Sequence, residues 1–407
     1  MRGYKITTGR SRTWEVILIV GLFTFLSGGF SFTAWPLGDK SYIRTLSVIL
    51  LFYFVFKVSL KKTQNFQYYV LALAFLPFVS VFYSYHEYGQ PVFDGIKGTL
   101  PSLLWLFYFV FHRFKIREAS FLKAVFYIAV FIVMVQIVQQ LTYPDVLFGV
   151  HDEEELAPNQ ELASNRNGIW RFYIGSNGVF TAIILFFVWC KMRMRFREKH
   201  LLIIVLMHVS IYLTLTRQLI FSALLTLFLS YFLGKKNIKL WVLLSGLAIV
   251  VLLYIYSDTL FGDFIKQTED ESSKDYIRFI SANYFWTETF TSVQAMFFGH
   301  GTAVSGYFLS LKDDLEEEYS FHVNDVGFIG MMWVYGLFYV YLCYDLLMQL
   351  FWDKKSSVPL YIRLFVIFAS VISVMIFPMF SYVQRVMWCF LLYICDIHIN
   401  KSKKAVL

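Results

Sequence analysis

Apolar residues dominate the chain in long runs, and short polar or basic stretches separate these runs. About 20 consecutive apolar residues form a helix long enough to cross the ~30 Å hydrocarbon core of a bilayer. The pattern therefore predicts an all-α polytopic membrane protein with about 12 transmembrane helices. The predicted spans are residues 14–35, 42–60, 66–85, 97–112, 121–142, 169–190, 200–215, 218–233, 239–256, 323–350, 359–378 and 381–397.

The distribution of charge predicts the orientation of these spans. Charged residues make up 16% of the 407 residues, against roughly 25% in an ordinary soluble protein. The net charge of +8 comes from basic clusters between the apolar runs, such as KMRMRFREK at 191–199. Short loops rich in Lys and Arg stay in the cytoplasm. We therefore interpret the clusters as topology signals rather than a nucleic-acid-binding surface, and both termini are predicted to be cytoplasmic.

Two other sequence features are interpreted in the same way. The run 14–35 follows a basic start, as the apolar part of a signal peptide does, but it is long and lacks a small-x-small cleavage site. We predict that it is the first span. The four cysteines form no C-x-x-C pair, which indicates neither a disulfide framework nor a zinc site.

The predicted outer loops are acidic, and one of them is very long. The whole chain, 1–407, is predicted to be a single integral-membrane domain, with a large outer loop at 257–322 between the ninth and tenth spans. A connection of about 65 residues is longer than usual and favours a functional role. Its aromatic-rich part, 276–301, is typical of an amphipathic helix that lies at the membrane interface.

Arg217 is the only permanently charged residue between Leu201 and Leu233. These 33 residues would make a helix of about 50 Å, too long for one crossing, and both flanks are basic. The chain must therefore reverse near the midpoint, which places Arg217 at the outer end of a tight helical hairpin. One interpretation is an arginine that reaches the lipid headgroups. The other is a guanidinium that binds a phosphate with its planar fork.

Two more arginines are predicted on the outer side. Arg278 follows an acidic stretch and precedes an aromatic segment, so it either pairs with Asp275 or Glu271 or provides a second contact to an anion. Arg171 stands where the sixth span is predicted to begin. It is either an interfacial anchor beside Trp170 or a third contact to the same anion.

The stretch YSFHVNDVGFIGMMWVYG combines titratable residues with glycines at the outer mouth of the tenth span. His322 and Asp325 are one helical turn apart, so their side chains should share a face. Gly327, Gly330 and Gly336 would allow close packing or the approach of a ligand. Asp325 could instead cap the helix, and His322 could be a satisfied interface residue. As a functional residue, His322 has the side chain best suited to act as a base near neutral pH.

Together these residues predict a site for a polyanionic lipid that carries a sugar. Arginines would hold a diphosphate, and aromatic and acidic side chains would hold the glycan. A base would activate a sugar hydroxyl while arginines stabilise the departing diphosphate. The sequence has no DxD or other obvious pair of metal-binding carboxylates in this context, so no metal and no cofactor are expected.

Four stretches of the C-terminal two thirds occur in a characteristic order: IWRFYIGSNGVF, LTLTRQL, Arg278 with its aromatic segment and FFGHGTAVSGY, and HVNDVGFIGMMWVYGLFYV. In these stretches and the large outer loop, the sequence resembles the O-antigen polymerase and O-antigen ligase superfamily of bacterial envelope membrane proteins. The ligase pattern usually has His followed directly by Asn, whereas Val323 separates His322 from Asn324 here. The Asp-x-Gly-aromatic entry at 325–328 is more similar to that of the polymerases.

The resemblance implies a metal-independent glycosyltransferase of the bacterial inner membrane that uses no nucleotide sugar. Undecaprenyl diphosphate would be the leaving group. Arg217 and Arg278 would bind the diphosphate, and His322 or Asp325 would lie at the acceptor. The expected partners are undecaprenyl-diphosphate-linked glycans, membrane lipids and a chain-length regulator or flippase. Two alternatives stay open: a ligase that transfers the glycan to lipid A–core, and a flippase for the lipid-linked unit.

Overall fold

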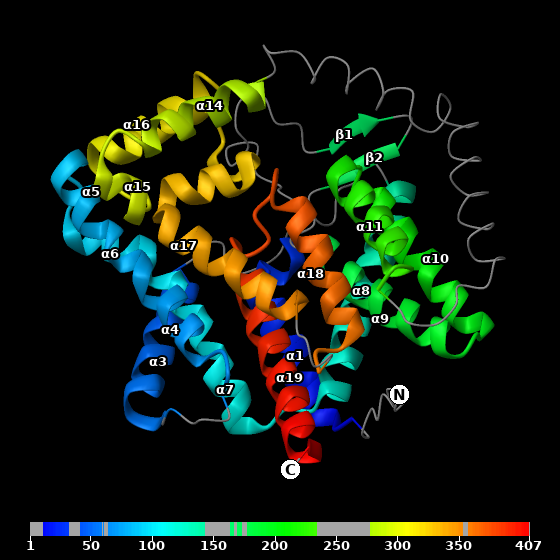
Figure 1. Cartoon of the computed structure of the whole chain (residues 1–407). Helices are drawn as coiled ribbons and strands as arrows, with labels where there is room; N and C mark the ends of the chain where they lie inside the picture. Colours follow the sequence, from blue (N-terminus) through cyan, green and yellow to red (C-terminus); the bar gives the residue numbers. More distant parts are fainter. Residues whose placement is uncertain are drawn as a thin grey trace.

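The structure is a computed structural model, and nearly all of its regular structure is helical (Figure 1). It describes residues 11–31, 41–58, 60, 64–142, 163–166, 169–172, 177–233, 277–352 and 357–406. The predicted helical fold is confirmed for this part of the chain. The predicted ninth span at 239–256 lies outside the described residues, as does the part of the predicted outer loop at 257–276.

The N-terminal half contains helices of very different lengths. They are α1 (Thr13–Leu26), α2 (Gly28–Ser31), α3 (Ser41–Lys57), α4 (Gln67–Phe75), η1 (Leu76–Phe78), α5 (Ser80–Tyr88), α6 (Val92–Thr99), η2 (Leu100–Leu106), α7 (Phe107–Phe114), α8 (Glu118–Thr142), α9 (Asn177–Met194), α10 (Glu198–Leu213) and α11 (Arg217–Ser230). Prolines at the starts of η1 and η2 lack an amide hydrogen, so α4 to α5 and α6 to α7 are interrupted rather than straight rods.

The C-terminal half begins with three helices from the predicted outer loop. Its elements are α14 (Ile277–Thr289), α15 (Val293–Phe298), α16 (Gly306–Glu317), η4 (Val323–Val326), α17 (Gly327–Phe351), α18 (Leu360–Ile372) and α19 (Tyr382–Val406). The aromatic-rich stretch 276–301 is therefore helical over most of its length, and α14 packs against α17. Its position at a membrane interface stays a prediction.

Three helical segments are long and apolar enough to cross a membrane, within the residues that the structure describes. They are Gln67–Tyr88, Glu118–Thr142 and Val323–Phe351. Shorter apolar helices cover Thr13–Leu26, Arg217–Ser230 and Leu360–Ile372. These findings support a membrane protein. The count of twelve spans and the side on which each loop lies stay predictions.

The start of the sixth predicted span is wrong. Residues 169–172 form strand β2 (Ile169–Phe172), which pairs antiparallel with β1 (Ala163–Arg166), and α9 begins only at Asn177. The alternation of polar and apolar residues in ASNRNGIWRF suits a short hairpin, whereas hydropathy averaged over a long window merges this stretch with the apolar helix that follows. The all-α description is therefore correct for the helical bundle but omits this hairpin.

Helix α17 is broken at Gly336, which has φ 80° and ψ 171°. A backbone of this kind is open essentially only to glycine. The break frees the carbonyls of Trp333 and Val334, and the preceding chain supplies their donors. The His300 amide donates to the Trp333 carbonyl at 2.7 Å, and the Gly301 amide donates to the Val334 carbonyl at 2.9 Å. The loop between α15 and α16 thus closes the gap in a buried helix.

The bundle has two distinguishable ends (Figure 1). Helices α14 and α16 lie at one end, whereas α19 ends and α1 begins at the other. Near the second end, Tyr361 at the start of α18 donates a hydrogen bond to Glu118 at the start of α8. Helices α8 and α18 therefore run from the second end towards the first. We call the first end the α14 end and the second the terminal end.

Candidate functional site

An ion pair joins two of the predicted site residues at the α14 end. The Nη2 atom of Arg278 in α14 lies 3.9 Å from Oδ2 of Asp325 in η4. The two side chains are 32% and 49% exposed, and an exposed pair at this distance contributes well under about 1 kcal/mol to stability. Arg278 therefore keeps most of its capacity to bind an anionic ligand. The alternative partners Asp275 and Glu271 lie outside the described residues.

His322 and Asp325 lie on one turn of 3₁₀-helix. The amide of Asp325 donates to the carbonyl of His322 at 3.0 Å. His322 precedes the helix with an extended backbone, φ −95° and ψ 116°, and Asp325 lies inside it, so this backbone bond brings the two residues into one turn. Asp325 is not an N-cap residue, because the N-cap residues of η4 and α17 are His322 and Val326, and neither caps with its side chain. Asp325 instead lies in the first turn of η4, as its alternative role beside a helix start requires.

Close backbone contacts hold this turn in place. Gly327 follows it with φ 53°, and a Cβ atom there would lie 2.3 Å from the carbonyl oxygen of Ser373. The amide of Phe328 donates to that same carbonyl at 2.9 Å. On the other side, the amide of Phe321 donates to the carbonyl of Leu315 in α16. The residues that carry chemistry therefore stand on a support that neighbouring backbone fixes from two directions.

Arg217 is the first residue of α11 and follows a tight turn after α10. Leu215 in this turn has φ 48°, and residues 214–216 connect the two helices. The predicted hairpin and its reversal beside Arg217 are confirmed. Helix α11 packs against α18, and the chain after α18 supplies the Ser373 carbonyl that holds Phe328. Arg193 at the end of α9 donates to the Ser230 carbonyl at the end of α11 at 2.6 Å, and Lys191 near the end of α9 lines a pocket with Ala119 at the start of α8. Helix α11 therefore ends at the terminal end, and Arg217 begins it at the α14 end, on a different element from Arg278 and Asp325.

Arg171 lies on β2, where its backbone is opposite Ser164 of β1. Strand β2 contacts α8 and α10. The side chain of Arg171 is outside what the structure describes. The structure therefore brings together Arg278, His322 and Asp325, with Arg217 at the same end of the bundle, and leaves the contact predicted for Arg171 untested.

Arg385 is a residue that the sequence reasoning missed. It lies near the start of α19 and is only 2% exposed. Its Nη2 donates to the hydroxyl of Tyr335 at 3.1 Å, its Nε donates to the carbonyl of Met379 at 3.3 Å, and the guanidinium lies over the Tyr335 ring. All these partners are neutral. The sequence carried the signal, because Arg385 is the only charged residue between Arg363 and Asp396.

His300 has a structural role rather than the role of a base. It is 1% exposed, its ring stacks on that of Trp333, and Nδ1 shares a 2.5 Å hydrogen bond with the hydroxyl of Tyr88. Nε2 lies 3.2 Å from the carbonyl of Glu288. Burial lowers the pKa of His300 to about 4, so the ring is neutral near pH 7. Both nitrogens are occupied, and the imidazole locks α14 and α5 to the loop that fills the break in α17.

No group of three or more His, Cys, Asp and Glu side chains is placed to hold a metal ion, among the residues that the structure describes. The four cysteines are buried and unpaired. No family model matches the chain, and no curated protein matches it either. The residues at the α14 end and the resemblance of the four sequence stretches are therefore what point to a function.

Proposed function

We propose that the protein polymerises undecaprenyl-diphosphate-linked oligosaccharide repeat units into O-antigen or a related surface polysaccharide. The reaction would take place at the periplasmic face of a bacterial inner membrane. The observation that carries the proposal is the grouping of Arg278, His322 and Asp325 on two elements at the α14 end. The twelve-span topology with cytoplasmic termini belongs to the same proposal, and it places the α14 end in the periplasm.

The proposed step transfers a glycan from one lipid carrier to the sugar of another. His322 or Asp325 accepts the proton of an acceptor hydroxyl, whose oxygen attacks the anomeric carbon of the donor glycan. The bond between that carbon and the diphosphate oxygen breaks, and undecaprenyl diphosphate leaves with the electron pair. Arg278 and Arg217, with Arg171 as a third contact, stabilise the charge that develops on the diphosphate. A planar guanidinium suits this task because it can bind two phosphate oxygens at once.

The looseness of the Arg278–Asp325 pair supports this assignment. A guanidinium that was buried and held by two carboxylate oxygens would have fewer of its five N–H donors open to a diphosphate. Here the pair is 3.9 Å apart and both side chains are accessible. A diphosphate that displaced Asp325 from Arg278 would also leave the carboxylate free to accept a proton, which couples donor binding to the readiness of the base.

The test compares alanine variants with a matched control from the same end. Arg278→Ala and Arg217→Ala cells are expected to make polysaccharide with sharply shortened chains or none. Lys312→Ala is the control, because it removes one cation from neighbouring α16, where Lys312 pairs with Glu316 at 2.8 Å. Full-length polysaccharide with a normal chain distribution in the two arginine variants would refute their role.

A second comparison identifies the base. If His322 accepts the proton, His322→Gln abolishes transfer and Asp325→Asn only weakens it; the reverse order assigns the role to Asp325. If both purified variants lengthen a lipid-linked repeat unit as fast as the wild type does, neither His322 nor Asp325 is the base.

The alternative functions give different results in a deletion strain. Core capped with a single repeat unit supports a polymerase, whereas uncapped core with accumulated lipid-linked polymer indicates a ligase. Purified protein in detergent has no membrane to transport across. If it lengthens a lipid-linked repeat unit there, transport is not its sole activity; if it does not, and the unit fails to cross the membrane in deletion cells, the flippase is the better description.

A further inference from the structure

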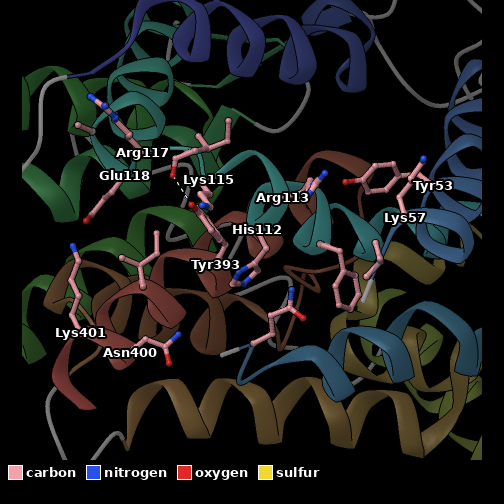
Figure 2. A pocket seen from close by; sticks show the side chains of 16 residues that line it. Tyr53, Lys57, His112, Arg113, Lys115, Arg117, Glu118, Tyr393, Asn400 and Lys401 are labelled. Carbon is pink, nitrogen blue, oxygen red and sulfur yellow. Dashed lines mark hydrogen bonds between the residues drawn. The ribbon is translucent and has the colours of Figure 1, made fainter. Parts of the chain in front are cut away.

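A cavity of about 900 Å³ lies at the terminal end, opposite the proposed transfer site. Its walls come from the end of α3, the end of α7, the start of α8 and the C-terminal part of α19 (Figure 2). The apolar part of the lining includes Val58, Phe109 and Ile397. The cavity shares no lining residue with the candidate site at the α14 end, so it needs a separate explanation.

The wall of the cavity is strongly basic. It carries five permanently cationic side chains: Lys57, Arg113, Lys115, Arg117 and Lys401. Among the described lining residues the only carboxylate is that of Glu118, which already accepts hydrogen bonds from Tyr361 at 3.0 Å and His398 at 2.8 Å. In the described ranges, Lys57, Arg113, Lys115 and Lys401 have no carboxylate within 4.0 Å. The cavity therefore concentrates positive charge in excess of the one carboxylate found among its described lining residues.

The basic wall is held in place by buried contacts. Lys115 has φ 49° in the tight turn between α7 and α8, and the hydroxyl of Tyr393 donates to the neighbouring Ile116 carbonyl at 2.8 Å (Figure 2). His112 lies 2.9 Å from the carboxylate of Asp396, which is fully buried. These contacts fix the turn and the α7 wall before a ligand arrives, and a preorganised site loses less entropy on binding.

One polar group in the wall has no partner. The hydroxyl of Tyr53, from α3, is buried and makes no hydrogen bond within the part of the chain that the structure describes. A buried hydroxyl without a partner costs about 1–3 kcal/mol, and an acceptor atom of a ligand would remove this penalty. In Figure 2 the Tyr53 side chain lies near Arg113 and Lys57 on the same side of the cavity.

We propose that this cavity binds a phosphate-bearing anion with more than one negative charge, at the face opposite the proposed transfer site. Arginine and lysine side chains bind phosphate oxygens through charge-assisted hydrogen bonds. The Tyr53 hydroxyl donates another, and the apolar wall accommodates a carbon skeleton or the first part of a lipid chain. The phosphate comes either from a lipid headgroup or from a soluble compound, and the experiment below separates the two sources. The site does not depend on the proposed polymerase activity.

Positive charge at a cytoplasmic face also serves as a topology signal, so the test must separate a site from a charged surface. Arg113→Gln/Lys401→Gln removes two charges from the cavity. The control, Arg195→Gln/Arg197→Gln, removes two exposed charges from the α9–α10 connection, which does not line this cavity. Tyr53→Phe removes the unpartnered hydroxyl and changes no charge. If Arg113→Gln/Lys401→Gln does not fold as the wild type does, Lys57→Gln/Lys115→Gln takes its place as the cavity pair.

The measurements use the full-length protein and two probes. Binding of radiolabelled inorganic pyrophosphate is measured by equilibrium dialysis in detergent. Retention of lipid is measured by native mass spectrometry after extraction from vesicles of phosphatidylcholine and phosphatidylglycerol. We expect the cavity pair to weaken pyrophosphate binding or anionic-lipid retention by about tenfold or more, and Tyr53→Phe to weaken it several-fold. The control pair should match the wild type.

The outcomes decide between the sources or reject the site. Saturable pyrophosphate binding that the cavity pair weakens assigns a soluble phosphate compound. Retention of phosphatidylglycerol that is lost only in the cavity pair, without pyrophosphate binding, assigns a lipid headgroup. Equal loss in the cavity and control pairs overturns the proposal in favour of a general surface charge. The proposal is also overturned if the wild type binds neither probe, or if it binds both and no cavity variant changes that binding.

Discussion

The break in α17 leads to a sharp prediction for Gly336→Ala. Gly336 has φ 80° and ψ 171°, and a Cβ atom there would lie 2.3 Å from the Phe297 carbonyl oxygen. Real Cβ contacts are essentially never shorter than 3.0 Å, and the nearest atoms that this Cβ would meet belong to backbone rather than to a flexible side chain. The loop that fills the break must therefore move away. This movement pulls the His300 and Gly301 amides from the carbonyls that they satisfy.

The size of the effect follows from two contributions. An alanine in a glycine-only backbone conformation costs about 1–3 kcal/mol. Loss of the two hydrogen bonds costs about 0.5–1.5 kcal/mol each, and more where a buried carbonyl is left without a donor. We therefore expect Gly336→Ala to lower the free energy of unfolding by about 2–6 kcal/mol. The control is Gly89→Ala: Gly89 has φ 65°, but a Cβ atom there meets no other atom within 4 Å. That change costs only about 1–2 kcal/mol.

The assay is denaturant unfolding of both purified variants in the same detergent, followed by hydrogen exchange of the amides of His300 and Gly301. Gly336→Ala should unfold at clearly lower denaturant and should lose protection of these two amides, whereas Gly89→Ala should keep it. If the two variants lose the same stability, or if both amides stay protected in Gly336→Ala, the α15–α16 loop does not hold the break in α17 as described.

Three further predictions concern buried polar groups. Because the pKa of His300 is about 4 when folded and about 6.5 when unfolded, its contribution is fully present above pH 6.5 and falls by about 3 kcal/mol as the pH drops to 4. His300→Gln should flatten this part of the stability–pH curve; an unchanged slope contradicts the assignment. Arg385→Met replaces a buried cation whose partners are neutral, so the melting temperature of this variant should equal or exceed that of the wild type. A large decrease in melting temperature would contradict this and show that a negative charge balances the cation. Asp396→Asn should destabilise by about 2–4 kcal/mol, because Asn65, Tyr108 and His112 all direct hydrogen bonds at its carboxylate; a melting curve like that of the wild type would contradict this.

Part of the fold could be predicted because it depends on local lengths. The hairpin around Arg217 follows from one argument: an apolar run too long for a single crossing, with basic flanks, must reverse near its middle. The structure places the turn at residues 214–216. His322 and Asp325 lie at a 3₁₀ turn rather than in the expected α-helix, and the shared face of their side chains stays a prediction.

Other features depend on contacts between distant parts of the chain, which hydropathy does not encode. Residues 328–344 carry no charge on either side of Gly336, so hydropathy does not show that the helix breaks there. The break becomes tolerable only because amides 33 residues earlier satisfy its carbonyls. For Arg278, the nearby acids Asp275 and Glu271 were the natural partners by sequence distance. The partner recorded in the structure, Asp325, is 47 residues away.

Arg385 was missed for a different reason. Like Arg217, Arg385 is an isolated charge in a long apolar run. Its environment, however, is a buried pocket of neutral partners near the start of α19 rather than the tip of a hairpin. Isolation in the sequence therefore indicates an unusual environment without indicating which one.

The filled break in α17 also constrains how the gene can change. The amides of His300 and Gly301 must reach two particular carbonyls, so the stretch from Phe297 to Gly301 can neither gain nor lose a residue without leaving one carbonyl empty. A loop usually tolerates insertions and deletions, but this loop acts as a spacer of set length. Homologues should therefore keep the same number of residues between Phe297 and Gly301, even where the residue types differ. Their differences in length should fall in other parts of the segment before η4.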